Sequence, residues 1–394
     1  MKYKRLGTMM FGAFLVLLFA ATVHARLTAW EISNLQAGLY EHSATFTVGP
    51  NPATERDISE LCGLVPPENW WVGAPFKAME LRGAALPSSF SWCDQGACPP
   101  IRNQGSCGSC WAFATVGPLE SNILIEGGEA ADLSEQYLVS CTAAGSCSGG
   151  WWAHNYHQDP GAVPENEFPY VSSDVSCAGP YSHPWQIDSW SYVNPYSNVP
   201  PVDEIKQAIM DYGPVTVAIY VGSAFQAYQS GIFNTSQNST VNHGVVLVGW
   251  DDNQGDNGVW ILRNSWGTYW GEGGYMRIEY GTSQVGYAAN YIVYSTDVSA
   301  DFTGDPTEGE TPNIVNFTDQ STGNITSWFW DFGDESTSEE QHPTHTYDAS
   351  GAYTVSLTVS GPGGSDTETK TDFISATRTA RKSIVPALIL LRIP

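Results

Sequence analysis

The sequence predicts an α+β domain in which a helical half precedes a β-rich half, followed by a smaller all-β domain. Two runs with a helical pattern, 109–126 and 132–141, precede four strand-like runs, which start at positions 214, 243, 258 and 274. Near the C-terminus, 352–360 alternates apolar and polar side chains, as a half-buried strand does. With 394 residues, of which 42 % are hydrophobic, the chain is long enough for two or three domains with packed cores.

The first helix is predicted where apolar side chains recur at helical spacing. These side chains are Phe113, Val116, Leu119, Ile123 and Leu124. Ser109 belongs to the residue types that cap helix N-termini. Pro118 lies inside the pattern and predicts a kink or a break, because proline has no N–H to donate. In the second helix, "LSEQ" at 133–136 offers a capping box at Ser134.

The charge balance excludes one class of partner. The chain has 16 Lys and Arg against 41 Asp and Glu, which gives a formal net charge of −25. Because nucleic-acid binding needs clustered Lys and Arg, we expect no nucleic-acid partner. A surface this acidic is compatible with an exported protein.

The N-terminus has the pattern of a signal peptide over 1–25. Basic residues at positions 2, 4 and 5 precede the apolar run 9–21, and "VHA" at 23–25 has the small residues of a cleavage site. A membrane anchor is the alternative, but the run is shorter than the roughly 20 residues that a spanning helix needs. We therefore expect a protein that is secreted or held at the cell surface, where disulfides are stable.

The eight cysteines leave two arrangements open. They are Cys62, Cys93, Cys98, Cys107, Cys110, Cys141, Cys147 and Cys177. An even number in an exported chain is compatible with four bridges, or with three bridges and two thiols, one of them chemical. A zinc site would need CxxC repeated at ligand spacing or accompanied by paired histidines, and neither pattern is present, so no metal is expected. A redox CxxC at 107–110 would follow a strand in a βαβ context, which is not predicted there.

Cys110 is a candidate nucleophile because it stands at the predicted start of a helix, where unpaired N–H groups stabilise a thiolate. His243, in an apolar strand, is a candidate base and acid, and Asn264 on the next strand-like run can orient its ring. Gln104 can direct its NH₂ at a developing oxyanion, beside the N–H of Cys110. Taken singly, each residue also has a structural explanation. Cys110 could be a disulfide partner and His243 a hydrogen-bonded core histidine. Asn264 could be a turn or cap residue, and Gln104 a loop residue.

Together, the motifs over 86–294 resemble the papain family of cysteine peptidases. The carrying segments, in chain order, are "LPSSFSWCDQG", "NQGSCGSCWAF", "LSEQYLVSC", "CSGGW", "GPVTVAIYV", "FQAYQSGIF", "VNHGVVLVGW" and "WILRNSWGTYWGEGGYMRIE". The resemblance implies a two-lobed α+β fold, with a helical lobe and a β-barrel-like lobe. It also implies that Cys110 is the nucleophile and His243 the general base and acid. Asn264 is then the amide that orients the histidine, and Gln104 the oxyanion donor.

Four further positions take a role from the resemblance. Trp266 matches the indole that shields the Asn–His hydrogen bond from water. Gly149 and Gly150 match the cleft wall that pairs with an extended substrate. Asn290 is placed on the floor of the main specificity pocket, although the alignment slips near "VGYAANY".

The resemblance also implies how the cysteines pair. Cys107 is expected to bond Cys147, and Cys141 to bond Cys177. Cys93 and Cys98 then form a short local bridge, and Cys110 stays free. The eighth cysteine, Cys62, falls in the segment that is expected to be removed on activation.

The region 325–359, "ITSWFWDFGDESTSEEQHPTHTYDASGAYTVSLTV", resembles the PKD family, an immunoglobulin-like β-sandwich. The expected organisation is a signal peptide (1–25), a prosegment (26–85, cleaved near 84–86), a papain-like peptidase domain (86–295) and a linker (296–311). A PKD domain (312–376, with a start near 298 as the alternative) and a tail of unassigned role (377–394) complete the chain.

These resemblances imply a secreted cysteine endopeptidase, made as a zymogen, that hydrolyses peptide bonds through an acyl-thioester on Cys110. An endopeptidase is favoured because 150–168 is too short for an occluding loop. No cofactor is implied. Protein or peptide substrates are expected, the PKD domain is a spacer or binds a surface protein or glycan, and we expect a monomer. Two alternatives remain: a catalytically silent adhesion protein on a peptidase scaffold, and an acyl transferase that uses the same site.

Overall fold

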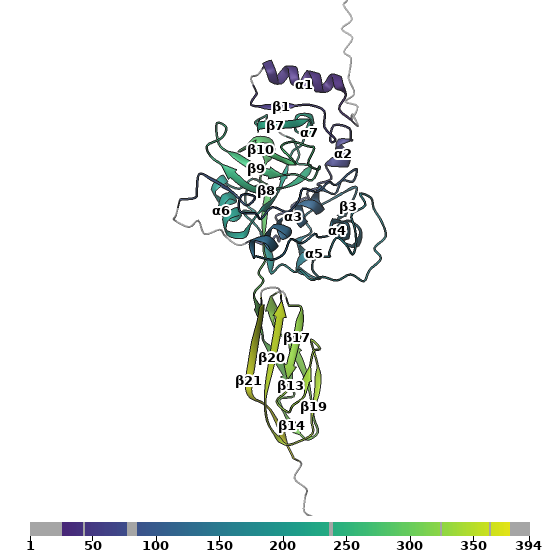
Figure 1. Cartoon of the computed structure of the whole chain (residues 1–394), viewed down its shortest axis with the longest axis vertical. Coiled ribbons are helices and arrows are strands. Elements are labelled where there is room, and N and C mark those ends of the chain that lie inside the picture. The colour runs from purple at the N-terminus through teal and green to yellow at the C-terminus, as the bar shows by residue number, and fades with distance from the viewer. Residues whose placement is uncertain are drawn as a thin grey trace, which may run out of the picture.

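The computed structural model describes residues 26–41, 44–76, 85–235, 239–323, 325–361 and 364–378. The expected signal peptide and nearly all of the expected tail lie outside these ranges, as does 77–84, next to the expected cleavage region. No helix within the described ranges is long and apolar enough to cross a bilayer. Figure 1 shows a mixed α/β body with α1 at one end and an elongated all-β domain at the other.

Helix α3 (Cys110–Ile125) runs through the centre of the mixed body and is buried along almost its whole length. Pro118 lies inside α3 without ending it, so the predicted interruption is wrong. Proline cannot donate to the carbonyl of Ala114 four residues earlier. That carbonyl instead accepts a hydrogen bond from the hydroxyl of Thr216, at 2.7 Å, so a residue from another element satisfies it.

The other elements of the helical half are short. They are α4 (Glu135–Cys141), β3 (Gly145–Ser146), β4 (Gly149–Gly150) and α5 (His154–Gln158). The predicted helix at 132–141 thus begins at Glu135. Ser134 does cap it, by accepting from the N–H of Tyr137 at 3.0 Å, but Tyr137 at the third helical position cannot complete the predicted capping box.

A nine-stranded sheet forms the β-rich half, in the order β1-β7-β10-β9-β8-β6-β11-β5, with β2 paired to β8. Its strands are β1 (Phe46–Val48), β2 (Ser89–Ser91), β5 (Ser189–Tyr192), β6 (Val215–Ile219), β7 (Tyr228–Phe233), β8 (His243–Asp251), β9 (Val259–Arg263), β10 (Tyr275–Glu279) and β11 (Tyr287–Val293). Helices α6 (Val202–Tyr212), α7 (Ser223–Gln226) and the 3₁₀ turn η1 (Thr282–Gln284) complete this half. The four predicted strand runs correspond to β6, β8, β9 and β10.

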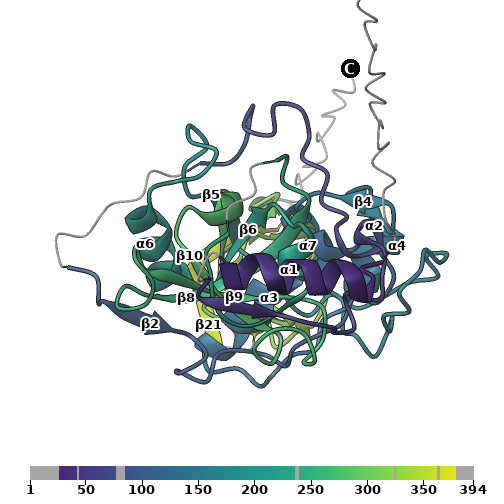
Figure 2. The same ribbon diagram turned by 90° about the horizontal axis from the view of Figure 1, so that it is seen from above.

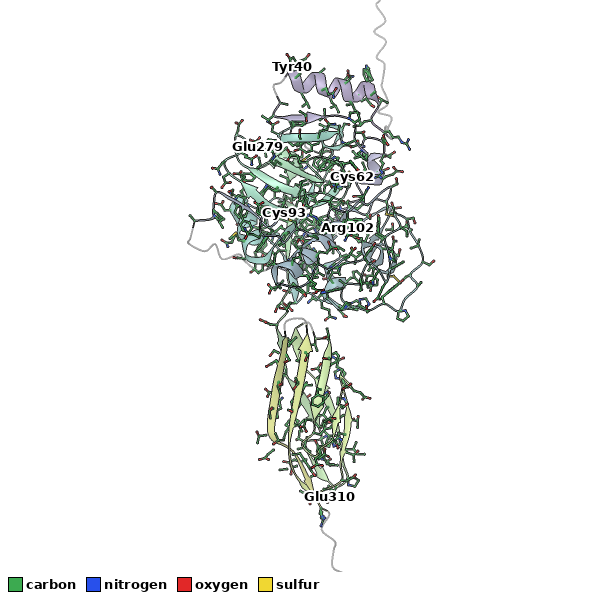
Figure 3. The ribbon with its side chains drawn as sticks, in the orientation of Figure 1. Tyr40, Cys62, Cys93, Arg102, Glu279 and Glu310 are labelled. Atoms are coloured by element: carbon green, nitrogen blue, oxygen red, sulfur yellow. A yellow bond between two sulfur atoms is a disulfide. The ribbon has the colours of Figure 1, made fainter. Side chains whose placement is uncertain are left out.

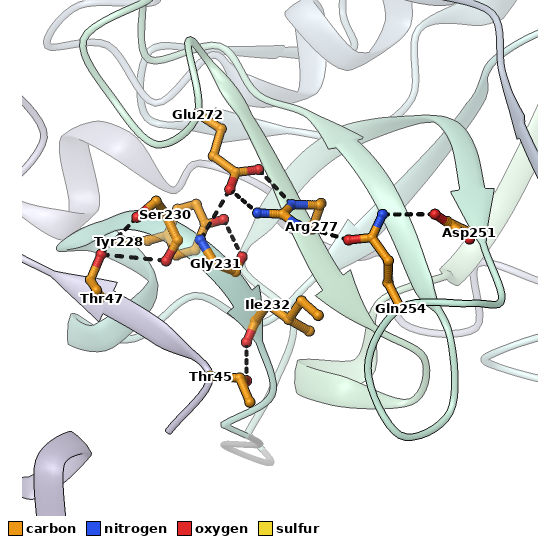
Figure 4. Close-up of polar contacts among 10 residues, drawn as sticks. All are labelled: Thr45, Thr47, Tyr228, Ser230, Gly231, Ile232, Asp251, Gln254, Glu272 and Arg277. Carbon is orange, nitrogen blue, oxygen red and sulfur yellow. Dashed lines mark hydrogen bonds and ion pairs between the residues drawn. The ribbon is translucent and has the colours of Figure 1, made fainter. Parts of the chain in front are cut away.

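The N-terminal segment 26–76 packs onto this body. Its helix α1 (Ala29–Glu41) and strand β1 lie over the β7 edge of the sheet, and Figure 2 looks down on α1 from that side. Figure 4 shows how the edge is joined: the hydroxyl of Thr45 donates to the carbonyl of Ile232 at 2.7 Å, and the hydroxyls of Thr47 and Ser230 lie 2.9 Å apart. From β1 the chain continues to the short helix α2 (Ile58–Leu61), which Asp57 caps.

The C-terminal domain is a sandwich of two antiparallel-rich sheets, β13-β15-β19 and β14-β21-β20-β17-β18, with the small pair β12-β16 at one end. The strands are β12 (Val298–Ser299), β13 (Phe302–Asp305), β14 (Glu308–Glu310), β15 (Asn313–Asp319), β16 (Thr322–Gly323), β17 (Ser327–Asp331), β18 (Thr337–Ser338), β19 (Thr344–Tyr347), β20 (Gly351–Gly361) and β21 (Gly364–Thr377). Trp330, Tyr347 and Leu357 are central in its apolar core. Strands β12, β13 and β14 fall within the expected linker 296–311 and pair with later strands, which favours the alternative start of this domain near 298.

Candidate active site

Cys110 is the first residue of α3 and is completely buried. Its neighbour in the CxxC pattern, Cys107, is bonded to Cys147 with an S–S distance of 2.04 Å, so it does not compete for the thiol of Cys110. Further bridges join Cys93 to Cys98 and Cys141 to Cys177. Cys110 therefore stands as a thiol at a helix N-terminus, where N–H groups without helical partners favour a negative charge.

The side-chain cap that Ser109 was expected to make on α3 is absent. Ser109 precedes Cys110, but its hydroxyl makes no hydrogen bond to the first turn of the helix. It instead lies 2.6 Å from the hydroxyl of Tyr170, which donates to the carbonyl of Gln104 at 2.8 Å. Tyr170 thus ties the residue before the thiol to the expected oxyanion donor, and no local sequence pattern marked it.

His243 begins β8 and is also completely buried. Its Nε2 lies 2.8 Å from Oδ1 of Asn264, which directly follows β9. Because Oδ1 is an acceptor, Nε2 carries the ring hydrogen in the neutral form, and Nδ1 is the nitrogen left to take a proton. A Cβ on Gly244, the next residue, would lie 3.2 Å from the carbonyl oxygen of Cys110, which places the start of β8 against the start of α3.

Trp266 lies against the His243 ring. The centroids of its ring and of the His243 ring are 4.8 Å apart, and Trp266 is buried. This is the position expected of a side chain that keeps water away from the bond between His243 and Asn264.

Gln104 is buried, and hydrogen bonds to both its Oε1 and its Nε2 fix the orientation of its side-chain amide. Its Oε1 accepts from the hydroxyl of Ser265 at 2.7 Å. Its Nε2 donates to the carbonyl of Cys107 at 2.9 Å and to the carbonyl of Leu61, in the N-terminal segment, at 3.1 Å. Ser265 was not singled out from the sequence, although it directly follows Asn264.

The N-terminal segment passes directly over the thiol. The N–H of Gly63 donates to Sγ of Cys110 at 3.3 Å, and the N–H of Leu64 donates to the carbonyl of Asn242, the residue before His243, at 3.0 Å. Residues 61–64 therefore occupy the space that a substrate would need to reach Cys110.

Beyond the thiol, the same segment pairs with the predicted glycine wall. The N–H of Gly150 donates to the carbonyl of Gly63, and the N–H of Val65 donates to the carbonyl of Gly150, both at 2.9 Å, in a parallel bridge. A Cβ on Gly150 would lie 2.5 Å from the Trp111 ring, so a side chain here would displace the indole. Gly149 adjoins the bridge with φ +125°, a conformation open to glycine.

Asn290 is buried, with its amide engaged by the protein. Its Nδ2 donates to the carbonyl of Ala288 at 3.0 Å, and its Oδ1 accepts from Nε2 of His154 at 2.8 Å. None of these bonds joins Asn290 to Cys110 or His243, and its place on the floor of a specificity pocket stays a prediction. Its partner His154 was not anticipated from the sequence.

Burial changes the protonation of the covered site. It raises the pKa of the Cys110 thiol to about 11, although the backbone N–H groups of Gly244 and Gly63 lower it. It lowers the pKa of the His243 imidazole to about 4, against smaller opposite effects of Asn264 and of the Leu61 backbone. Near neutral pH the covered site therefore holds a neutral thiol and a neutral imidazole, since burial disfavours both charged forms.

Comparison with known proteins agrees with this geometry. A family model for papain family cysteine proteases matches residues 86–296, and one for the PKD domain matches 298–376. The chain is 38 % identical over 205 residues to the probable cysteine protease RD21C of Arabidopsis thaliana, which is 50 % of this chain and 44 % of that relative. It is 41 % identical over 202 residues to zingipain-2 of Zingiber officinale, covering 49 % of this chain and 88 % of the relative.

Among solved structures, the digestive procathepsin L2 proteinase from Tenebrio molitor larval midgut matches 68 % of this chain and 95 % of its own, with 27 % identity and a TM-score of 0.59. The predicted fold class is confirmed by the papain-like neighbour and by the all-β C-terminal region. The papain-family match spans more than half of the chain. The chain therefore belongs to the papain family of cysteine proteases and carries a C-terminal PKD domain.

Proposed function

We propose that this protein is a secreted cysteine endopeptidase made as a zymogen, in which residues 26–85 form the prosegment. The observation that carries the proposal is the contact of one short segment, 61–65, with the expected oxyanion donor, nucleophile and substrate wall and with the residue before the expected base. That segment contacts the Gln104 amide, the Cys110 thiol, the residue before His243 and the Gly150 backbone. A peptide bound there by the protein itself indicates what the site binds once the segment has been removed.

The reaction begins when removal of the segment returns water and substrate to the site. The burial that keeps Cys110 and His243 neutral is then relieved, and the proton of the thiol passes to Nδ1 of His243. The N-terminus of α3 stabilises the thiolate, and Asn264 holds the imidazolium through Nε2. The nucleophile and its acid are thus formed together from two neutral groups.

The thiolate attacks the carbonyl carbon of the peptide bond to be cleaved. The negative charge that develops on the carbonyl oxygen is met by Nε2 of Gln104 and by the N–H of Cys110. The carbonyl of Leu61 already accepts from Nε2 of Gln104, which supports this site as the oxyanion position. The imidazolium gives its proton to the leaving amine, and water, activated by the same ring, then hydrolyses the acyl-thioester.

Protein or peptide substrates are proposed because Gly150 offers one N–H and one carbonyl to an extended chain, as the edge of a sheet does. An endopeptidase remains favoured since 151–168 contains only the short helix α5 and no long insertion over the cleft. Export rests on the N-terminal pattern at 1–25, which lies outside the described residues. For the PKD domain, a spacer role or binding to a surface protein or glycan is proposed.

The proposal is tested by treating processed protein with a peptidyl inhibitor that alkylates thiols. Labelling of Cys110 alone, together with hydrolysis of protein substrates, supports a peptidase. An intact fold without labelling or hydrolysis would favour the silent scaffold. If an added amine captured most of the acyl product in place of water, the same residues would serve acyl transfer.

A further inference from the structure

A second thiol lies in the segment that covers Cys110. The structure describes all eight cysteines, and six of them form the three bridges; Cys62 and Cys110 are the two that do not. Figure 3 labels Cys62 where the N-terminal segment meets the body of the peptidase domain. Cys110 is completely buried, whereas Cys62 is partly exposed.

The backbone on both sides of Cys62 is held at the active site. Before it, the carbonyl of Leu61 accepts from Gln104; after it, Gly63 donates to Sγ of Cys110 and Leu64 donates to the carbonyl of Asn242. The N–H of Cys62 itself donates to the carbonyl of Ile58 at 2.8 Å and closes α2. Cys62 is therefore fixed near the nucleophile by anchored neighbours on both sides, Leu61 before it and Gly63 and Leu64 after it.

The spacing suits a bond between the two sulfurs. The nitrogen of Gly63 lies 3.3 Å from Sγ of Cys110 and is separated from Cα of Cys62 by two covalent bonds. Cα of Cys62 therefore lies within about 6 Å of that sulfur, given standard backbone dimensions. Because Cα and Sγ of one cysteine are about 3 Å apart, the two Cα atoms are at most about 9 Å apart. Disulfides join residues whose Cα atoms are about 4.4–6.8 Å apart, so the bond needs a side-chain rotation and, at that upper limit, a shift of the segment by about 2 Å.

Two further observations support the closeness of the pair. A Cβ on Gly63 would lie 1.7 Å from the carbonyl oxygen of Gly108, so the segment is pressed against the loop that leads to Cys110. Burial raises the pKa of Cys62 well above its ordinary value, and the nearby Cys110 raises it further. The two thiols thus share one environment.

We infer that Cys62 and Cys110 form a reversible disulfide when the zymogen meets a small-molecule disulfide, which locks the prosegment onto the nucleophile. The inference rests on the proposed function, because Cys110 is the nucleophile that it protects. Activation of the oxidised precursor then needs a reductant before, or together with, proteolysis. The bond also shields the sulfur of Cys110 from irreversible oxidation before activation.

The chemistry is two thiol–disulfide exchanges. Cys62 is partly exposed and can therefore be reached by the disulfide RSSR, although burial disfavours its thiolate. It loses its proton and attacks RSSR, which forms Cys62–S–S–R and releases RS⁻. Cys110 then loses its proton and attacks the sulfur of Cys62, and the second RS⁻ leaves. Two protein thiols are oxidised, one RSSR is reduced to two RSH, and the two protons go to the released thiolates. Because the thiolate attacks, the lock forms faster as pH rises.

The test uses full-length precursor equilibrated in mixtures of oxidised and reduced glutathione. Remaining thiols are alkylated, and peptides are mapped without reduction. The expected result is a peptide pair linked through Cys62 and Cys110, which disappears as the share of reduced glutathione rises. Free Cys62 and Cys110 at every ratio, or glutathione on either cysteine in place of the linked pair, would overturn the inference. This measurement needs no variant, so misfolding cannot obscure it.

The matched variant is Cys62→Ser, which replaces one sulfur by oxygen. A fixed amount of an added processing protease should activate the oxidised wild type about tenfold or more faster once reductant is present, but should activate Cys62→Ser at the same rate with or without it. Equal rates for oxidised and reduced wild type would overturn the lock. If processed wild type hydrolyses peptides but the wild-type precursor forms no linked pair, the lock alone fails. If the pair forms but processed protein hydrolyses nothing, the proposed function fails.

Discussion

Nε2 of Gln104 donates to the carbonyl oxygen of Leu61 across 3.1 Å, so the expected oxyanion donor already holds a peptide carbonyl of the chain's own N-terminal segment. The same segment covers the thiol of Cys110 and pairs with Gly150. One stretch of chain therefore engages the expected oxyanion donor, nucleophile and substrate wall together.

Gln104→Glu removes the amide donor at nearly constant shape. The turnover number of the processed protein should fall about 10²–10³-fold, the usual loss for one oxyanion donor, with the Michaelis constant changed much less. Steady-state kinetics on a peptide substrate provide the measurement. Ser265→Ala, which removes the hydroxyl that holds Oε1 of Gln104, should give a smaller loss in the same direction. An unchanged turnover number in Gln104→Glu would exclude Gln104 as the oxyanion donor.

Asn264→Ala removes the acceptor that orients His243. Without it the ring is free to turn or change tautomer, so the turnover number should fall about tenfold or more. Asn253→Ala is the control, because Asn253 is an exposed asparagine whose Nδ2 donates to the side chains of Ser88 and Asp251, away from His243. Equal kinetics for both variants would show that the bond between Asn264 and His243 has no part in catalysis.

Gly63→Ala should loosen the covering segment in the precursor. The new Cβ would meet the carbonyl oxygen of Gly108 at 1.7 Å, and backbone cannot move aside as easily as a side chain. Overpacking of this kind costs about 1–3 kcal/mol, so alkylation of Cys110 in reduced precursor should be about 5-fold to 150-fold faster.

The matched control for that substitution is Gly38→Ala in α1, where a Cβ would have no neighbour within 4 Å. Its alkylation rate at Cys110 should equal that of the wild type. Rates are read by peptide mapping at timed intervals. A Gly63→Ala precursor as slow as Gly38→Ala would mean that the 61–65 segment does not limit access to the thiol.

Acid should destabilise the peptidase domain through its buried histidines. Burial lowers the pKa of His154 to about 4 and that of His157 to about 3, so the folded state keeps both neutral where the unfolded chain takes up protons. Stability from these groups is complete above pH 6.5 and is lost as pH falls from there towards 4. Between pH 7 and pH 5 each contributes a loss of about 2 kcal/mol in the free energy of unfolding.

His154→Gln tests this pH dependence, because glutamine can still donate to Asn290 but does not titrate. Urea unfolding of the peptidase domain at pH 7 and pH 5, in a Cys110→Ala background that prevents self-digestion, gives the two free energies. The loss on acidification should be about 2 kcal/mol smaller in the variant. An unchanged pH dependence would show that His154 is not held neutral by burial.

Much of the framework follows from local pattern. The spacing of apolar residues predicted α3, an apolar run predicted β8, and the alternation of side chains predicted β20. The exceptions depend on partners distant in sequence: Pro118 does not interrupt α3 because Thr216 satisfies the freed carbonyl, and Ser109 does not cap it because Tyr170 takes its hydroxyl.

Two features of the site and the fold could not be read from local pattern. The path of 61–65 over Cys110 depends on backbone contacts, which side-chain periodicity does not encode. Strands β13 and β14 contain aspartate, glutamate and glycine, which are typical of loops, and β12 has only two residues. Their strand character comes from pairing with β15, β21 and β16, respectively. The closeness of Cys62 to Cys110 likewise follows only from the contacts of Leu61, Gly63 and Leu64, which no local sequence pattern predicts.

The most direct test of the central claim, that Cys110 is the nucleophile, compares three precursors processed by the same added protease: wild type, Cys110→Ala and Cys62→Ser. Each is incubated with a peptide library, and the cleaved bonds are identified by mass spectrometry. Wild type and Cys62→Ser should cleave internal peptide bonds at similar rates, and Cys110→Ala should cleave none above background. Cleavage by Cys110→Ala at the rate of the wild type would contradict the account.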